Sequence, residues 1–449
     1  MGERLVVIGG VAAGMSAASQ AKRRKPDLEV VVLERGEWVS YGACGMPYNI
    51  QDPERRIDDL VVISAERFRT ERGIDVRTGH EAIELDLGKR TARVRRPGGE
   101  SELAFDQLVI ATGCRPIRPD WPGMDLAGVF VLHSLDHAQA IKRHLADRSL
   151  RRAAVVGGGH IGLEMADVLS ARGLAVTLFK RSPELPTGYP EEITRTVGQE
   201  LARYGVDLRV GVEVLGFEGQ GRMERVLTEQ GPVDADLVLV AIGVRPEVEL
   251  ARQAGIRLGP SGAIAVDDRM QSSAEGVFAA GDCAEAYHRL LGRGVFLPRG
   301  TTANKQGRIA GANVAGADER FRGVLGSSVT KIFSLAVGHT GLTIAEAWAE
   351  GLEADSVSIE ARTRAHAYPG SRSIAVRLVF EPGGGRLLGA QMAGGEGVAK
   401  RLDVVAAALT AGFDVDELAG LDMSYAPPFA PVWDPVLVAA NQARKKIRR

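Results

Sequence analysis

Two glycine-rich segments of this sequence have the residue types and the spacing that phosphate binding requires. The first, Gly9-Gly10-Val11-Ala12-Ala13-Gly14, follows the apolar run 5–8. The second, Gly157-Gly158-Gly159-His160-Ile161-Gly162, follows 153–156 and completes the pattern G-x-G-x-x-G, whereas Val11 replaces the middle glycine of the first. Glycines let a turn approach a phosphate, and the following helix supplies N–H groups and positive potential. Each segment is therefore predicted to hold the pyrophosphate of a dinucleotide.

The residues that end the next strand differ between the two segments. The strand predicted at 28–33 closes on Glu34, and an acid at this point is typical of a site for ribose hydroxyls. The strand predicted at 175–179 closes on Lys180 and Arg181 instead. Two cations there favour a 2′-phosphate, so NADPH is as good a candidate as NADH, unless both side chains point into solvent.

Elements of one kind must position both segments. In each case a buried parallel strand leads into the glycines, a helix of small residues follows (predicted at 15–21 in the first unit and from Leu163 in the second), and a second strand comes next. This is the layout of a dinucleotide-binding fold. Two such folds in one chain indicate an oxidoreductase that passes electrons between a flavin and a nicotinamide.

The composition excludes some classes of partner and indicates the cellular location to expect. The 449 residues include 56 Lys+Arg and 57 Asp+Glu, a net charge of −1, which argues against nucleic acid or an acidic membrane as partner. No apolar stretch is long enough for a membrane span, and no signal peptide or metal site is predicted. Three cysteines are too few and too scattered for a disulfide framework. We therefore expect a cytoplasmic protein.

Further motifs carry a family resemblance. Ile110-Ala111-Thr112-Gly113 and Ala241-Ile242-Gly243 end strands, and Ala280-Gly281-Asp282 joins a strand to an acid. With the two glycine segments, these resemble the FAD- and NAD(P)-dependent pyridine nucleotide-disulfide oxidoreductases over essentially the whole chain. The resemblance implies an α/β fold with two Rossmann-like domains and a C-terminal α+β domain. It divides the chain into an FAD domain (1–115 and 250–325), an NAD(P) domain (116–249) and a dimerisation domain (326–449), and it implies a homodimer.

One segment separates branches of that family. Ser40-Tyr41-Gly42-Ala43-Cys44-Gly45-Met46-Pro47-Tyr48 holds one cysteine, and Asn49 stands where two-cysteine members have the second. This segment, with 302–308 and 422–429, resembles the single-cysteine branch: coenzyme A-disulfide reductases, persulfide reductases, and NADH oxidases and peroxidases. Cys114 and Cys283 are predicted to be buried packing residues.

The resemblance assigns roles to particular residues. Cys44 would react as a thiolate with a coenzyme A disulfide or persulfide, and Tyr425 and Tyr368 would supply protons. Binding of coenzyme A would use Gln20, Arg23, Ser40, Asn304, Arg308 and Trp433. FAD and NADPH or NADH would be bound by Gly9, Gly10, Ala13, Gly14, Glu34, Arg35, Ala111, Thr112, Gly113, Asp282 and Ala303, and by Gly157, Gly159, His160, Ile161, Gly162, Glu164, Lys180, Arg181 and Gly243.

Three positions depart from the family pattern. Ala43 precedes the cysteine where relatives often have Asn, Trp433 replaces a Lys before Asp434, and His160 stands where relatives place Tyr or Phe over the flavin. Trp433 would either stack on adenine or close the pocket to coenzyme A.

Two other functions stay open. An NAD(P)H oxidase would reduce O2, but oxidase and peroxidase relatives carry a histidine in the first glycine turn where this chain has Ala12. A flavin-dependent electron-transfer protein would donate to a protein such as a ferredoxin without using Cys44.

Overall fold

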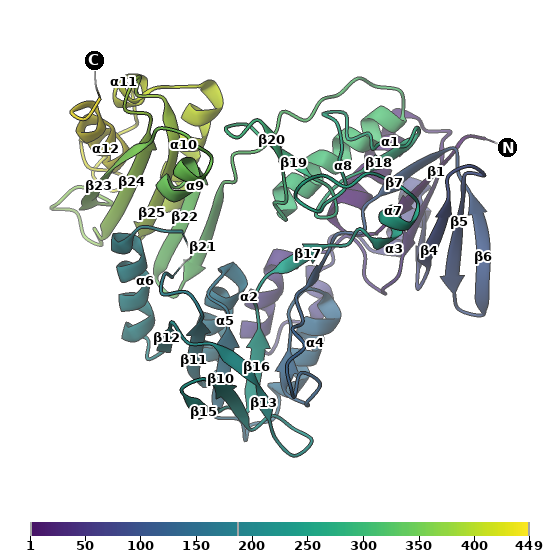
Figure 1. Cartoon of the computed structure of the whole chain (residues 1–449), viewed down its shortest axis with the longest axis horizontal. Helices are drawn as coiled ribbons and strands as arrows, with labels where there is room; N and C mark the ends of the chain where they lie inside the picture. Colours follow the sequence, from purple (N-terminus) through teal and green to yellow (C-terminus); the bar gives the residue numbers. More distant parts are fainter. Residues whose placement is uncertain (1, 186–187, 448–449) are drawn as a thin grey trace. The chain divides into compact units, whose positions relative to one another are not determined.

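The computed structural model describes residues 2–185 and 188–447. The chain divides into two compact units, and Figure 1 labels their helices and strands. Unit 1 contains Met1–Ile117, His133–Lys142 and Val244–Val324, and unit 2 contains Arg118–Leu132, Arg143–Gly243 and Leu325–Arg449. Both combine parallel sheets with helices, so the predicted α/β class is confirmed.

A five-stranded parallel sheet forms the centre of unit 1. Its order is β18-β7-β1-β2-β3, and its strands are β18 (Val277–Ala279), β7 (Gln107–Ile110), β1 (Arg4–Ile8), β2 (Glu29–Glu34) and β3 (Asp75–Thr78). Strand β1 is buried along Leu5 to Ile8, as a strand covered on both faces requires. All the strands run the same way, so the residues that follow β1, β2, β7 and β18 share one edge.

Helices α1 (Ala12–Arg24) and α8 (Gly300–Val314) pack closely together beside this sheet. The approach depends on glycines, because a Cβ on Gly307 would lie 2.2 Å from the Ala13 oxygen, and one on Gly311 2.1 Å from the Ala17 oxygen. This close packing fixes the position of α8 relative to the first glycine turn, which leads into α1.

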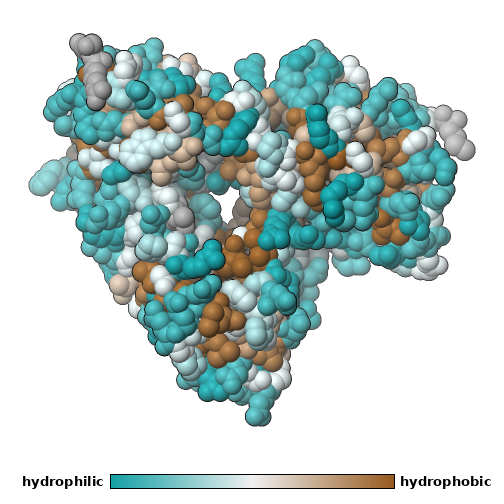
Figure 2. All heavy atoms as spheres, viewed as in Figure 1, coloured by the Kyte–Doolittle hydropathy of each residue, from teal (hydrophilic) through white to brown (hydrophobic). Residues whose placement is uncertain are grey.

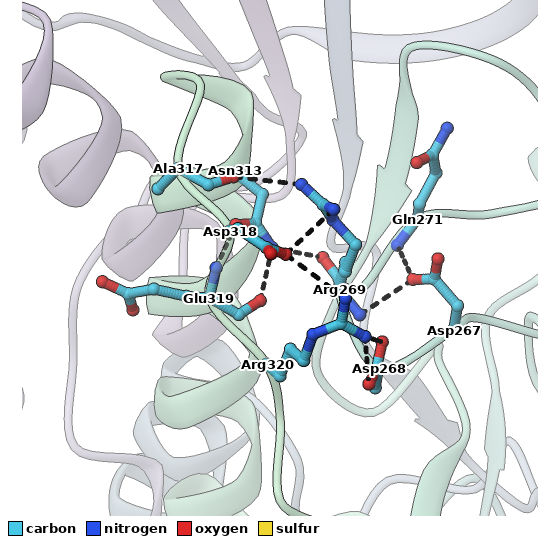
Figure 3. Close-up of polar contacts among 9 residues, drawn as sticks. All are labelled: Asp267, Asp268, Arg269, Gln271, Asn313, Ala317, Asp318, Glu319 and Arg320. Atoms are coloured by element: carbon cyan, nitrogen blue, oxygen red, sulfur yellow. Dashed lines mark hydrogen bonds and ion pairs between the residues drawn. The ribbon is translucent and has the colours of Figure 1, made fainter.

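A polar network fixes the C-terminal end of α8 (Figure 3). Arg269 forms an ion pair of 2.9 Å with Asp318, and Arg320 pairs with Asp268 at 2.8 Å. The Asn313 amide donates to the carbonyl oxygens of Arg269 and Glu319 at 2.9 and 2.8 Å. The loop before β18 is thus attached to α8, whose other end lies near the predicted flavin site.

Smaller elements complete unit 1. They are helices α2 (Met46–Gln51), α3 (Ala65–Arg72), α4 (Leu135–His144) and α7 (Glu249–Gln253); the antiparallel sheet of β4 (Glu81–Asp86), β5 (Thr91–Arg96) and β6 (Gly99–Ala104); and the pairs β8 (Cys114–Pro116) with β17 (Val244–Pro246) and β19 (Ala286–His288) with β20 (Arg293–Val295). The last two residues of α4 belong to unit 2.

Unit 2 repeats the parallel architecture in the order β12-β11-β10-β16-β9. The strands are β12 (Asp207–Val210), β11 (Ala175–Lys180), β10 (Arg152–Val156), β16 (Leu237–Val240) and β9 (Val129–Phe130), with helices α5 (His160–Ala171) and α6 (Glu191–Arg203). An antiparallel sheet of β13 (Val214–Glu218), β14 (Arg225–Thr228) and β15 (Gly231–Asp234) adjoins it. On the face shown in Figure 2, hydrophobic residues reach the surface in places, and Leu215 of β13 is 49% exposed.

The C-terminal part of unit 2 is an antiparallel sheet with helices, in the order β21-β22-β25-β24-β23. The elements are β21 (Ser328–Ile332), β22 (Leu335–Gly341), β23 (Asp355–Arg362), β24 (Ser373–Phe380), β25 (Leu387–Gly394), α9 (Ile344–Ala349), α10 (Val398–Ala411), α11 (Val415–Ala419) and α12 (Pro435–Arg444). Carboxylates of α5 and α6 bind the β21–β22 hairpin: Asp167 accepts from the Phe333 N–H and Glu200 from the Ser334 N–H, both at 2.8 Å.

The predicted helix starts are three residues late. Helix α5 begins at His160 rather than Leu163, and α1 begins at Ala12 rather than Met15. In both motifs the tight turn is complete after its first three residues, so the remaining three already form the first helical turn. The domain limits derived from the resemblance remain predictions.

Candidate functional site: two dinucleotide turns and an exposed cysteine

The first glycine turn packs backbone directly against backbone. Gly9 has φ +107, and a Cβ there would lie 2.1 Å from the Ala111 oxygen; a Cβ on Gly14 would lie 1.8 Å from the Gly9 oxygen. Only glycine fits at either position. Helix α1 follows with no acidic residue in its first turn, which leaves its N–H groups and positive potential for an anion. These residues fit the pyrophosphate of FAD.

Glu34 closes β2 beside this turn. Its Oε2 accepts a hydrogen bond from the Gly10 N–H at 2.7 Å, and its Oε1 accepts one from the Gly36 N–H at 2.8 Å. The carboxylate is therefore fixed at the position where the fold family places a ribose. Arg35 follows it on the surface.

A third part of the same edge comes from β18 and α8. Gly281 has φ +85 and lies close to Ala13 and Ala303. The fully buried Gln306 accepts from the Gly281 N–H and donates to the Glu285 carbonyl, both at 2.9 Å. Gln306 thus holds the turn that presents Asp282, a role that the sequence did not reveal because Gln306 and Gly281 meet only in the folded chain.

Burial governs the ionisation of Asp282. Desolvation raises the pKa of this carboxyl, although the Cys114 thiol donates to its Oδ2 at 3.4 Å and opposes the shift. The pKa of the Cys114 thiol is also raised, first by burial and then by Asp282. Cys114 and Cys283 are both buried, which confirms their prediction as packing residues.

Cys44 is exposed, in contrast to the other two cysteines. It lies in the 3-10 turn Ala43–Gly45, directly before α2. Its segment is attached to the first glycine turn because the Ser40 N–H donates to the Gly10 carbonyl at 2.9 Å. On its other side, the Gly42 N–H donates to the Leu60 carbonyl at 2.9 Å. A thiol is therefore presented from a loop fixed to the predicted flavin site.

The position of the second family cysteine has a structural role in this chain. Asn49 is 1% exposed, and its side-chain N–H donates to the Arg56 carbonyl at 2.7 Å. The Lys142 ammonium donates to the Asn49 side-chain oxygen at 3.1 Å and to the Asn49 carbonyl at 2.8 Å. This segment is held by buried polar bonds, and Cys44 has no thiol partner at position 49.

The predicted substrate residues of unit 1 differ in exposure. Gln20 is only 7% exposed and accepts a hydrogen bond from the exposed Arg23 at 2.7 Å. Asn304 and Arg308 lie on exposed positions of α8, and Asn304 accepts from the Ser16 hydroxyl at 2.8 Å. Gln20 thus contacts Arg23 rather than solvent, whereas Arg23, Asn304 and Arg308 are accessible.

The second glycine turn has the same backbone geometry. Gly157 has φ +115, and a Cβ on Gly162 would lie 1.9 Å from the Gly157 oxygen. Gly159 has open space where its Cβ would lie, and α5 has no acidic residue in its first turn. The turn therefore offers an open approach to a helix N-terminus, which fits a dinucleotide pyrophosphate.

The end of β11 provides the cationic edge of this turn. The Lys180 side chain lies along the turn, 3.0 Å from where a Cβ on Gly158 would be, and burial lowers the pKa of its ammonium. Arg181 is exposed. The end of β11 thus carries two cationic residues next to the second glycine turn, and their role toward a 2′-phosphate stays a prediction.

Two residues beside this turn were missed by sequence analysis. A cavity in unit 2 is lined by Gly158, Gly159, His160, Leu163, Tyr189, Thr330, Val337 and His339. The side chains of Tyr189 and His339 form a hydrogen bond in the cavity lining, with 2.6 Å between the phenol oxygen and Nδ1. Glu164 accepts from the Thr330 hydroxyl at 2.8 Å, so this predicted cofactor residue also supports the wall of the cavity. Nothing in the sequence links position 339 to the glycine turn.

The remaining predicted residues lie on two loops of the C-terminal sheet. Tyr368 is 38% exposed, Tyr425 50% and Trp433 63%. The loops contact each other, since the Ala365 N–H donates to the Pro427 carbonyl at 3.2 Å. The three side chains thus belong to unit 2, whereas Cys44 belongs to unit 1.

In the described part of the chain, no helix has the length and apolar character needed to span a membrane. Within residues 2–185 and 188–447, no group of three or more His, Cys, Asp or Glu side chains is arranged to hold a metal ion.

Sequence comparison relates the chain to known proteins over its full length. The pyridine nucleotide-disulphide oxidoreductase profile matches residues 3–317, and the dimerisation domain of the same family matches 327–435. An NAD(P)H coenzyme A polysulfide/persulfide reductase of Pyrococcus horikoshii is 42% identical, covering 98% of each chain. An NADH oxidase of Methanocaldococcus jannaschii is 35% identical, covering 99% of each.

Solved structures agree. An NAD-dependent persulfide reductase from A. fulgidus superposes with a TM-score of 0.96 at 37% identity, covering 99% of this chain and 83% of that one. These full-length similarities confirm the resemblance found in the sequence. They also account for the two glycine turns and the residues around them. The chain belongs to the pyridine nucleotide-disulphide oxidoreductase family.

Proposed function

We propose that this protein is an FAD-dependent reductase that uses NAD(P)H to reduce coenzyme A disulfide or coenzyme A persulfide through Cys44. The observation that carries the proposal is the exposed Cys44, on a loop bonded to the first glycine turn, with the buried Asn49 where a second thiol would be. Because Asn49 stands where a second cysteine would be, we infer that the Cys44 thiolate reacts with the sulfur of an external compound.

The proposed chemistry uses the Cys44 thiolate and one electron pair. FAD, held by the residues of the first glycine turn, would supply that electron pair from NAD(P)H. The Cys44 thiolate attacks one sulfur of the substrate disulfide, which forms a mixed disulfide and releases one thiolate. The electron pair then cleaves the mixed disulfide, releasing the second thiolate and restoring Cys44. One NAD(P)H and one proton thus convert one disulfide into two thiols.

The exposed aromatic residues of unit 2 would donate protons and contribute to substrate binding. Tyr425, with Tyr368, would protonate the leaving thiolate. Trp433 would stack on the adenine of coenzyme A, while Arg23, Asn304 and Arg308 offer hydrogen bonds or positive charge to its phosphates. The match to a dimerisation domain and the exposure of Phe429 (78%) and Trp433 (63%) support a homodimer that covers these side chains.

The relatives support this substrate class. The Pyrococcus horikoshii protein is named for coenzyme A polysulfide and persulfide, and a coenzyme A disulfide reductase of Staphylococcus aureus is 26% identical over 98% of this chain. A reduced thiol is required at Cys44, and such thiols are maintained in the cytoplasm, where we place the enzyme.

NAD(P)H oxidation by O2 is the second candidate, because NADH oxidases are also similar over the full length. Ala12 opens α1 in this chain, so the first turn offers no imidazole beside the flavin site.

Anaerobic steady-state kinetics separate the two functions. Under nitrogen, we expect NADPH consumption to depend on coenzyme A disulfide or persulfide and to release free coenzyme A. A negligible anaerobic rate together with rapid NADPH consumption in air would overturn the proposal in favour of the oxidase.

A further inference from the structure

The exposed aromatic residues of unit 2 lie on two long loops that have little regular structure of their own. Tyr368 belongs to the loop 363–371 after β23, and Tyr425 and Trp433 belong to the loop 421–434 before α12. Mobile loops would not hold three side chains at the positions that stacking and proton transfer require. Something must therefore fix both loops.

A buried ion pair connects them. Arg401 of α10 and Asp434 lie 2.9 Å apart, and their side chains are only 6% and 7% exposed. The Arg401 guanidinium also donates to the Thr363 carbonyl at 3.1 Å, and Asp434 accepts from the Val436 N–H at 2.9 Å, capping α12. One guanidinium thus holds the first residue of one loop and the last residue of the other.

The connection continues to the aromatic residues. Asp434 directly follows Trp433. On the other loop, the Ala365 carbonyl accepts from the Tyr368 N–H at 3.0 Å, while the Ala365 N–H bonds to Pro427, close to Tyr425. The Arg364 guanidinium lies 5.9 Å from the Tyr368 ring centroid and pairs with Glu396.

The fold makes room for this guanidinium. Gly397, which precedes α10, has φ +95, and a Cβ there would lie 2.4 Å from the Arg401 Nη1. A buried ion pair adds little net stability, because the cost of removing both charges from water offsets their attraction. Its hydrogen bonds, from Arg401 Nε to both carboxylate oxygens of Asp434 at 3.2 and 2.9 Å, are directional and specify geometry instead.

We propose that Arg401 is a positioning residue for the coenzyme A site: through Asp434 and the Thr363 carbonyl it fixes the two loops that present Tyr368, Tyr425 and Trp433. This inference rests on the proposed function. Arg401 itself contacts neither substrate nor cofactor in this role.

The test compares Arg401→Lys with Arg377→Lys. A lysine keeps the charge but cannot bind Asp434 and Thr363 together as a planar fork does. Arg377 of β24 serves as the matched control. It pairs with Glu192 of α6 at 3.0 Å, and the two side chains are 23% and 17% exposed. Asp434→Asn is the second variant, because asparagine keeps the helix cap while removing the charge.

We expect Arg401→Lys and Asp434→Asn to lower kcat/KM for coenzyme A disulfide by about tenfold or more. The KM for NADPH and the rate with ferricyanide, which takes electrons from the flavin without Cys44, should not change. Trypsin should cleave after Arg364 or Arg372 faster in both variants than in Arg377→Lys, as read by mass spectrometry of the fragments.

Unchanged coenzyme A kinetics in a folded variant, or equal losses with ferricyanide and coenzyme A disulfide, would overturn the inference. Failure of both variants to fold as flavoproteins would also overturn the inference. The ion pair would then be required for the fold itself and not specifically for the position of the two loops. If the wild-type protein itself reduces no coenzyme A compound, the proposed function fails, while the trypsin comparison still reports on the loops.

Discussion

The two glycine turns have almost the same backbone conformation. The side chains at the end of the next strand, however, carry opposite charges. Gly9 and Gly157 both have φ above +100 and both lie against the carbonyl of a neighbouring strand end. At the first turn, the Glu34 carboxylate accepts hydrogen bonds from two backbone N–H groups. At the second, the aliphatic part of Lys180 lies along the turn and Arg181 is exposed.

The difference fits the prediction of a retained flavin at the first turn and an exchanged nicotinamide cofactor at the second. The first turn is supported by the fully buried Gln306, the half-buried Asp282, and α8 packed onto α1. The second has open space at Gly159 and exposed cationic and imidazole side chains at Arg181 and His160. A site that binds and releases its ligand in every cycle needs this accessibility, whereas a site for a tightly held flavin does not.

The cysteine provides the largest expected contrast, because its loop is bonded to the first turn and lies in the same unit. Cys44→Ser should lower the rate of coenzyme A disulfide reduction at least about a thousandfold, since serine is a far poorer nucleophile toward sulfur. Reduction of the bound flavin by NADPH, followed by stopped-flow absorbance, should be unaffected. Cys283→Ala, at the other buried cysteine, serves as control and should keep its disulfide activity. Unchanged disulfide turnover in Cys44→Ser would disprove the thiol mechanism.

Glu34 tests whether the first turn holds the flavin. Glu34→Gln removes the charge that the ribose hydroxyls would meet, and we expect the Kd for FAD to rise by about a hundredfold. The ratio of flavin to protein absorbance after dialysis measures the loss. Glu37→Gln, an exposed neighbour, should retain its flavin. Equal retention in both variants would remove Glu34 from the site.

Lys180 and Arg181 test the second turn. Replacing them together with Met and Ala should raise the KM for NADPH by about tenfold or more and the KM for NADH much less, because only NADPH carries the 2′-phosphate. Arg195→Ala, at an exposed position of α6, is the control for loss of positive charge. Parallel increases for both nucleotides would contradict a 2′-phosphate role.

The smallest effect concerns the stability of the first site without its cofactor. Burial raises the pKa of Asp282, so the folded apoprotein binds this proton more tightly than the unfolded chain does. Ionisation therefore destabilises the fold as pH rises above the unfolded pKa of about 3.9, and the whole cost is present above the folded pKa. Asp282→Asn should raise the urea midpoint of the apoprotein at about pH 7 but not at about pH 3. The same increase at both pH values would point to another cause.

The strands and turns were predictable because their signals are local. An apolar run followed by closely spaced glycines specifies a buried strand and a tight turn wherever the chain goes afterwards, and β1, β2, β10 and β11 appear within a residue of their predicted limits. The helix starts were missed because the end of each glycine motif was assigned to the turn. The family resemblance supplied the redox role predicted for Cys44.

Contacts between distant segments could not be predicted from a single sequence. Gln306 supports Gly281 from another element, His339 reaches the second turn from the C-terminal sheet, and Arg401 meets Asp434 across 33 positions. None of these residues belongs to a motif that announces its partner. Each becomes informative only when burial and hydrogen-bond distance are known.

The attachment of the β21–β22 hairpin to α5 and α6 affects how this enzyme can be rebuilt. Glu164, Asp167 and Glu200 each bond to that hairpin, and Thr330, Val337 and His339 line the cavity at the second turn. A chimera that exchanges only the nicotinamide segment between relatives would cut through these contacts. Cofactor preference is therefore best transplanted as a block that includes residues 325–341, even though this stretch lies outside residues 116–249, the predicted NAD(P) domain.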